Sequence, residues 1–172
     1  RPGILTRMVR LEPARWSIVL FAIAAVSAPV LWLWYACARD PDIVFLSRHR
    51  PARWITYPLP ADPLARRAVE LDAQFRRSFT LSSVPDEATL EIRALRRFEI
   101  LLNDRQITFP DPNANWKVIV QGNVAEYLHV GENTIVVTVE HDRGPPVLWL
   151  CISTGGEDIR TDHSWEVSVA GS

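Results

Sequence analysis

Cysteine and glycine are scarce in this chain, and the few histidines are scattered. The 172 residues include two cysteines, seven glycines and four histidines. The cysteines follow no spacing pattern, because Cys37 ends a hydrophobic run and Cys151 falls inside a predicted strand. We therefore expect each cysteine to pack as a small apolar side chain rather than to form a disulfide. No group of residues has the spacing of metal ligands, so the sequence predicts neither a metal nor a cofactor.

An excess of positive charge is also missing. The 19 lysines and arginines are balanced by 20 acidic residues, and the arginines lie among acids rather than in a basic stripe. A nucleic-acid partner therefore has no electrostatic support.

Catalytic motifs are absent as well. A glycosidase needs two carboxylates at a set separation across a cleft, and nothing in the sequence marks such a pair. Carboxylates are present, such as Glu91, Glu99, Glu126 and Glu140, and most of them fall at outward positions of predicted strands. A nucleophile elbow, a phosphate-binding loop and a zinc motif do not occur. The sequence therefore predicts no catalytic residue and a chain that is not itself an enzyme.

One long hydrophobic run stands near the start of the chain. Residues 16–38 carry no charge, and as a helix they would extend about 34 Å, enough to cross a hydrocarbon core of about 30 Å. Arg15 and Arg39 bound the run, and tryptophans lie at both of its ends, as is typical of membrane interfaces. The run predicts a transmembrane helix from Trp16 to Ala38 in contact with membrane lipid. A signal peptide and a buried core helix are the alternatives.

The charges around this helix do not decide its orientation. The basic flank at residues 1–15 holds four arginines, and residues 39–53 hold four as well, so the positive-inside rule gives a tie. We expect the N-terminus in the cytoplasm, because a single span followed by a folded domain commonly acts as a signal anchor. A linker at 39–51 would then lead to an extracytoplasmic domain at 52–172, which is periplasmic or extracellular.

Short runs with a period of two fill this predicted domain. The runs expected to form strands are 73–83, 88–95, 98–103, 117–121, 133–141, 147–154 and 165–169. The run from Val147 to Thr154 is apolar on both faces and is predicted to be a central strand. Together the runs predict an all-β fold, an antiparallel jelly-roll-like sandwich preceded by one transmembrane helix.

Arginines interrupt this pattern. Arg77 falls on the apolar face of its run, where alternation expects a core residue. Arg93, with Arg96 and Arg97, is expected to form a solvated strand face followed by a turn. The pair Asn103-Asp104 stands between two β-type runs and predicts the tip of a hairpin.

The order of several fragments carries a resemblance to a known family. The fragments are Trp54-Ile55, FRRSFTL (75–81), ATLEIRALRRFEILLNDRQI (88–107), Trp116, VAEYLHVGENTIVVTV (124–139) and TDHSW (161–165). Their order resembles that of the galactose-binding-domain-like β-sandwiches that accompany glycoside hydrolases, particularly bacterial α-L-rhamnosidases and β-galactosidases. Asn103 matches the Asn of the family's x-V-N-G-x-x-V pattern, whereas Asp104 replaces its usual Gly. The resemblance covers roughly residues 52–170.

The resemblance implies a non-catalytic module that binds carbohydrate or supports a neighbouring domain. Sugar sites combine an aromatic face with polar side chains that bind hydroxyls. On this basis the predicted site residues are Trp116, Asn113, Asn115, Asp142, Arg143, Asp162 and His163. Each group also has a structural interpretation. Trp116 could fill the end of the sandwich, Asp142 and Arg143 could form a solvated turn, and Asp162 could cap a turn beside a core Trp165.

Two functions therefore stay open. The first is a membrane-anchored carbohydrate-binding or accessory module with a glycan ligand. The second is a structural or protein-interaction domain of a larger integral-membrane protein, such as a multi-pass glycosyltransferase. The sequence begins at Arg1 without Met, so we expect a piece of a longer chain with further domains as partners.

Overall fold

The computed structural model describes residues 13–43, 46, 50–58, 71–95, 97–109, 115–141, 145–156 and 158–170. The chain divides into two compact units, Arg1–Phe45 and Leu46–Ser172. The first unit contains one helix, and the second contains the strands. The predicted boundary between a linker and a sandwich at residues 51 and 52 falls a few residues inside the second unit.

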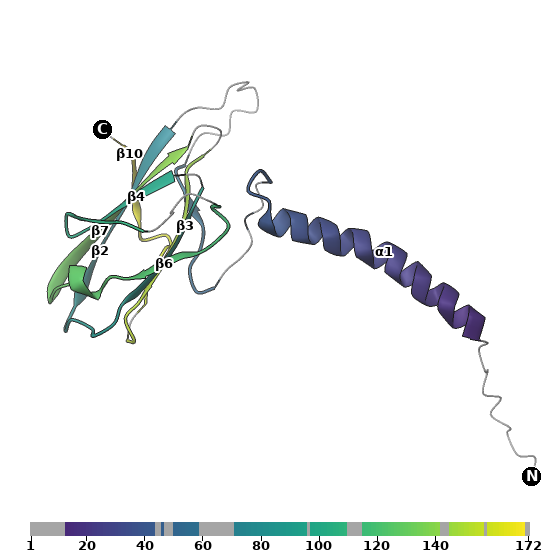
Figure 1. Cartoon of the computed structure of the whole chain (residues 1–172). Helices are drawn as coiled ribbons and strands as arrows, with labels where there is room; N and C mark the ends of the chain where they lie inside the picture. Colours follow the sequence, from purple (N-terminus) through teal and green to yellow (C-terminus); the bar gives the residue numbers. More distant parts are fainter. Residues whose placement is uncertain are drawn as a thin grey trace, which may run out of the picture. The chain divides into compact units, whose positions relative to one another are not determined.

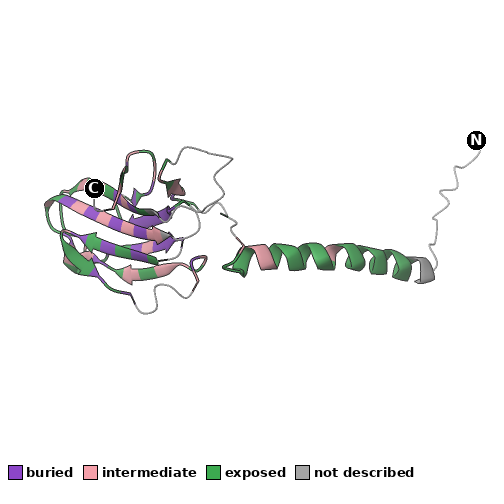
Figure 2. Ribbon diagram, turned by 90° about the horizontal axis from the view of Figure 1, so that it is seen from above, coloured by how far each residue is buried: buried purple, intermediate pink, exposed green. Residues whose placement is uncertain are grey.

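Helix α1 spans Pro13–Arg39 and includes the whole predicted run. Its segment Trp16–Arg39 has a mean hydropathy of 2.1 and contains no buried residue, and most of it has the exposed colouring in Figure 2. Pro29 lies inside the helix, as transmembrane helices tolerate. By length and composition α1 is able to cross a membrane, and a signal sequence near an N-terminus has the same properties.

The second unit is an antiparallel sandwich of two sheets, which confirms the predicted fold class (Figure 1). The sheet built around β8, here called the β8 sheet, contains β1 (Ile55–Thr56), β3 (Thr89–Ala94), β6 (Val120–Asn123), β8 (Val147–Ser153) and β9 (Ile159–Arg160). The other, the β7 sheet, contains β2 (Leu71–Leu81), β4 (Arg97–Leu102), β5 (Arg105–Ile107), β7 (Gly131–His141) and β10 (Glu166–Val169). A short 3₁₀ helix, η1 (Ala125–Tyr127), precedes β7.

The core lies between the two sheets and follows from the alternation in the sequence. Every second side chain of β4 and β7 is buried, and the bands of buried and exposed residues are visible along the strands in Figure 2. The fully buried side chains of this core include Phe75, Leu90, Ile92, Ile100, Leu102, Ile135, Val137, Leu148, Leu150 and Ile152. Removing this apolar surface from water is the main stabilising contribution to the fold.

Strand β8 is buried on both faces, as its all-apolar sequence predicts. It pairs with β3 along one edge and with β1 and β9 along the other. Trp149 and Cys151 belong to a cluster separate from the main core, with Ala52 and Trp54 packed against them. The β8 sheet therefore has a second apolar layer on its outer face. No disulfide joins Cys37 to Cys151.

A threonine connects the two short strands at the edge of β8. The Thr161 hydroxyl donates to the carbonyl oxygen of Arg53 at 2.6 Å and accepts from the backbone N–H of Leu150 at 3.1 Å. The N–H of Arg53 donates to the carbonyl oxygen of Thr161 at 3.0 Å. Thr161 is fully buried, so this side chain satisfies backbone groups where β1 and β9 leave a gap.

The predicted hairpin tip at Asn103-Asp104 is confirmed. Both residues have positive φ, 53° and 61°, and they join the antiparallel pair β4 and β5. The Asn103 side chain donates to Asn133 Oδ1 at 2.8 Å and accepts from the N–H of Thr134 at 2.9 Å. Asn133, fully buried, donates in turn to the carbonyl oxygen of His129 at 2.8 Å. Two asparagines that carry the family resemblance thus hold the hairpin against the segment that precedes β7.

The predicted strand at 117–121 is misplaced, because β6 begins only at Val120. Asn115 Oδ1 accepts from the N–H of Lys117 at 3.0 Å, and its carbonyl oxygen accepts from the N–H of Val118 at 2.9 Å. Because of these hydrogen bonds, the residues that were expected to begin the strand form a turn instead. Within β6, Gly122 lies against Phe109, where an added Cβ would stand 2.7 Å from Cε1 of the ring.

Candidate functional site

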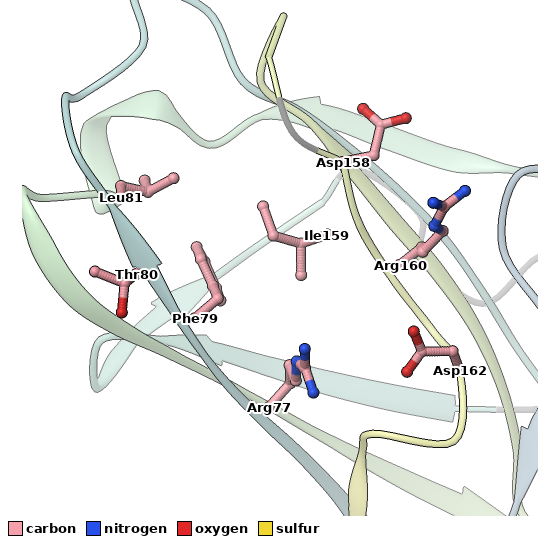
Figure 3. A pocket seen from close by; sticks show the side chains of 8 residues that line it. All are labelled: Arg77, Phe79, Thr80, Leu81, Asp158, Ile159, Arg160 and Asp162. Atoms are coloured by element: carbon pink, nitrogen blue, oxygen red, sulfur yellow. The ribbon is translucent and has the colours of Figure 1, made fainter.

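A pocket of about 290 Å³ opens at one edge of the sandwich (Figure 3). The second half of β2 forms one wall, and the segment around β9 forms the other. The lining residues are Arg77, Phe79, Thr80, Leu81, Asp158, Ile159, Arg160 and Asp162. In Figure 3 the apolar side chains of Phe79, Leu81 and Ile159 lie toward one side of the pocket, and the charged side chains of Asp158, Arg160 and Asp162 lie toward the other.

The pocket lies at this edge because strand pairing stops there. Strand β10 pairs with β2 from Ala73 to Arg76 only. On that side of the sheet, no described strand pairs with the remaining residues of β2, from Arg77 to Leu81. Strand β9 is likewise at an edge, because it pairs with β8 alone. Two open strand edges, one from each sheet, therefore border the pocket.

Arg77 is the residue that breaks the apolar face of β2. Its Nη1 donates to the carbonyl oxygen of Ser164 at 3.0 Å. This bond holds the guanidinium at the open edge of the sandwich, where it points toward the segment that carries Asp162 in Figure 3. Arg77 also lines a second pocket of about 380 Å³, together with Arg76, Ser78, Ser164 and Glu166.

Asp162 is a carboxylate held in its ionised form. Its Oδ1 accepts from the N–H of Ser164 at 2.8 Å and from the Ser164 hydroxyl. These hydrogen bonds, with smaller electrostatic contributions from the neighbouring Arg77 and His163, hold the pKa of Asp162 below its ordinary value. Near neutral pH the pocket therefore contains a fixed anion and a fixed cation from opposite walls.

The structure brings together few of the residues predicted from the sequence. Asp162 lines the pocket and also caps a turn, while Trp165 is buried in the core and donates from Nε1 to the carbonyl oxygen of Arg160 at 3.0 Å. His163 is exposed next to Asp162 and is not among the lining residues. Asn113, Asp142 and Arg143 lie outside the described residues.

Trp116 and Asn115 lie elsewhere, on the outer face of the β8 sheet. Trp116 is only 7% exposed and packs edge-to-face on Trp54, with ring centroids 6.3 Å apart. It belongs to a buried cluster with Leu95 and Val147. Its indole therefore packs against other side chains and presents no open face. The sugar-binding role assigned to Trp116 stays a prediction that the structure does not favour.

Sequence reasoning missed the residues that shape the pocket with Asp162: Arg77, Phe79, Asp158 and Arg160. One signal was present, because Arg77 interrupts an apolar strand face. The opposite wall of the pocket comes from residues about 80 positions later in the chain. No local sequence pattern predicts that these residues lie next to β2.

The chemistry of the pocket suits a polyhydroxylated, neutral ligand. A carboxylate accepts and a guanidinium donates two hydrogen bonds in one plane, which matches neighbouring hydroxyl groups. Among the described residues, no group of three or more His, Cys, Asp or Glu side chains is placed to hold a metal ion.

Comparisons with known proteins place the sandwich in the same fold class as domains of carbohydrate-active proteins. An α-L-rhamnosidase of Streptomyces avermitilis is 26% identical over 121 residues, which is 66% of this chain and 12% of that enzyme. The crystal structure of the Streptomyces avermitilis enzyme complexed with L-rhamnose matches with a TM-score of 0.54 at 22% identity, over 68% of this chain and 12% of that one. No protein-family model matches the chain.

Other solved structures have the same fold. The GH78 rhamnosidase of Bacillus sp. GL1 has a TM-score of 0.54 at 23% identity, over 72% of this chain and 14% of that one. The apo form of a lectin from Pleurotus ostreatus has a TM-score of 0.53 at 20% identity, over 69% of this chain and 35% of that one. The predicted resemblance to a β-sandwich of α-L-rhamnosidases is therefore confirmed. This chain spans about an eighth of the length of its Streptomyces relative.

Proposed function

We propose that this chain is a membrane-anchored, non-catalytic carbohydrate-binding module, with its sugar site in the pocket between β2 and β9. The observation that carries the proposal is the pair of opposite charges, Arg77 and Asp162, held on the two walls of one pocket that Phe79 and Ile159 also line. Rhamnosidases and a lectin with the same fold support a carbohydrate ligand, since both kinds of protein handle sugars.

The binding mode follows from the chemistry of the walls. The ionised Asp162 accepts hydrogen bonds from sugar hydroxyls, and the remaining N–H groups of Arg77 donate to the oxygens of a neighbouring pair. Phe79 offers a partly buried aromatic surface for the C–H side of the ring. Arg160 and Asp158 extend the same pattern along the rim, so a ligand longer than one sugar unit fits the charge distribution.

Helix α1 supplies the anchor in this proposal. It has the length and the apolar composition of a membrane span. With the N-terminus in the cytoplasm, the sandwich would face the periplasm or the cell exterior, where glycans are available. The orientation is tested with a cysteine introduced at the exposed position Ser82, in sealed vesicles. A thiol-blocking reagent is added on one side of the vesicles, and it prevents labelling of this cysteine only if the sandwich faces that side.

The binding proposal is tested with the full chain in lipid nanodiscs on a glycan array that includes rhamnosides. Specific binding should weaken at least about tenfold in Arg77→Gln and in Asp162→Asn, because each removes one charge-assisted set of hydrogen bonds. The matched control is Arg97→Gln, an exposed arginine of the other end of the β7 sheet. The proposal would be contradicted if the folded chain bound no glycan, or if both pocket variants bound as tightly as the wild type.

A second candidate is an interaction domain of a larger integral-membrane protein. It is favoured by an observation on the outer face of the β8 sheet. Arg93, expected on a solvated strand face, is only 9% exposed there, and its Nε has no hydrogen-bond partner among the described residues.

A further inference from the structure

The second pocket, of about 380 Å³, adjoins the first along strand β2. Arg76, Arg77, Ser78, Ser164 and Glu166 line it, so β2 and the segment that runs from β9 into β10 form its walls. Arg77 lines both pockets, which makes them neighbours. Each volume is near the lower end of the range of about 300–1,000 Å³ that is typical of ligand sites. The function proposed above occupies only the first pocket.

The second pocket contains two opposite charges that do not pair with each other. Arg76 of β2 and Glu166 of β10 are partners in the antiparallel register, in which Cβ atoms lie about 4.5–5.5 Å apart. Both residues are exposed, and neither side chain forms a hydrogen bond or an ion pair among the described residues. Arg97 and Glu140 are partners in the same way on the same sheet, and there Nη2 lies 3.0 Å from Oε2. The charged groups of Arg76 and Glu166 are therefore both available to a ligand.

The two pockets repeat one chemical arrangement. In each, a guanidinium from β2 and a carboxylate from the segment between β9 and β10 line the same space. The pairs are Arg77 with Asp162 in the first pocket and Arg76 with Glu166 in the second. A guanidinium only donates hydrogen bonds and an ionised carboxylate only accepts them, so each pair suits both roles of sugar hydroxyl groups. Each pair has no net charge, which favours a neutral sugar unit over an acidic one.

Ser164 connects the two pockets. Its carbonyl oxygen accepts from Arg77 Nη1 at 3.0 Å, and its N–H donates to Asp162 Oδ1 at 2.8 Å. Ser164 lines the second pocket itself, while its backbone holds both charged groups of the first. The other N–H groups of Arg77 have no hydrogen-bond partner among the described residues, so they are available to a ligand in either pocket.

From this repeat we infer that the ligand is a neutral oligosaccharide of at least two units, with one unit in each pocket and the second unit held by Arg76 and Glu166. The inference rests on the proposed function, because the first unit occupies the site of Arg77 and Asp162. Arg77 contacts both units, since it lines both pockets. The second unit should raise the affinity about tenfold, which corresponds to one hydrogen bond to a charged group.

The test compares methyl α-L-rhamnoside with an α-linked rhamnose disaccharide, by titration calorimetry of the full chain in lipid nanodiscs. The wild type should bind the disaccharide about tenfold more tightly than the monosaccharide. Arg76→Gln and Glu166→Gln should each remove most of this difference and leave the affinity for the monosaccharide unchanged, whereas Arg77→Gln should weaken the binding of both probes. Arg97→Gln and Glu140→Gln are the matched controls on the same sheet and should change neither affinity.

Three results would overturn the inference. Equal affinity of the wild type for the two probes would overturn it and leave the proposed function intact. Loss of the disaccharide advantage in Asp158→Asn, but not in Glu166→Gln, would place the second unit on the rim of the first pocket instead. If the folded wild type bound neither probe, the inference would fail, and the glycan array would decide separately on the proposed function.

Discussion

Arg77 and Arg93 are buried or half-buried arginines of the described part of the sandwich, and they have different surroundings. Arg77 interrupts the core-facing side of β2, and the protein provides a carbonyl oxygen and the nearby charge of Asp162. Arg93 faces outward from β3 and is more deeply buried, and its Nε has no hydrogen-bond partner among the described residues. The difference teaches that the groups around an arginine, as well as its burial, decide whether it can belong to a binding pocket.

The largest effect that sharpens this comparison concerns the floor beneath Arg93. Trp149→Ala should lower the free energy of unfolding by about 3–5 kcal/mol, because Trp149 is the largest fully buried side chain and its loss leaves a cavity. Urea denaturation of the chain in micelles measures this, with Val118→Ala at a 59% exposed side chain as the control. A loss below about 1 kcal/mol would mean that the outer layer is not part of the core.

The next effect contrasts Arg93 with a buried polar group that is fully satisfied. Asn133→Ala should lower the free energy of unfolding by about 2–3 kcal/mol, because backbone groups of His129 and Gly131 lose their partners inside the protein. Asn123→Ala, at an exposed amide that also bonds backbone N–H groups, should cost about 1 kcal/mol or less.

A smaller effect concerns the anion beside Arg77 and depends on pH. The pKa of Asp162 is lower in the folded chain than in the unfolded one, so its stabilisation is fully present above the unfolded-state pKa. It is lost as the pH falls through the lower folded-state pKa. Asp162→Asn should therefore cost about 1 kcal/mol at pH 7 and nothing in strong acid.

This pH dependence is measured by denaturation of both chains between pH 2 and pH 7. Asp158→Asn is the control, because Asp158 lines the same pocket at an exposed position. A constant difference between the wild type and Asp162→Asn at every pH would contradict the role assigned to the carboxylate charge.

The smallest effect is expected at an ordinary surface ion pair. Arg97 Nη2 lies 3.0 Å from Glu140 Oε2, and the two side chains are 72% and 37% exposed. A double-mutant cycle with alanine should give a coupling free energy below about 1 kcal/mol, because solvent screens the pair. A larger coupling would mean that Arg97→Gln is not a suitable control for Arg77→Gln.

Much of the fold could be predicted from alternation and turn chemistry. The two-sided apolar run of β8 identified the central strand, and Asn103-Asp104 identified a turn whose residues adopt positive φ. Strand β6 was misplaced because the Asn115 side chain forms a turn with its own neighbours, a contact that competes with strand extension.

The candidate site was less accessible to sequence reasoning, for a physical reason. Arg77 was recognisable as an exception, but its meaning depends on Asp162 and Ser164, which reach it only after the two sheets pack. Trp116 seemed suited to a sugar because it follows a polar loop, whereas long-range packing on Trp54 buries it. Local patterns report which face of a strand a residue occupies and leave open what later covers that face.

The way in which the last strands complete the sandwich has a consequence for its synthesis. Strand β10 pairs with β2, and Thr161 bridges the gap between β9 and the segment that leads into β1. The edges near the beginning of the sandwich therefore close only when residues 159–169 have left the ribosome. Helix α1 emerges long before them and needs none of these contacts to form. A nascent chain thus contains the whole of α1 while its β-domain is still unfolded, so the topology orders formation of the helix before folding of the sandwich.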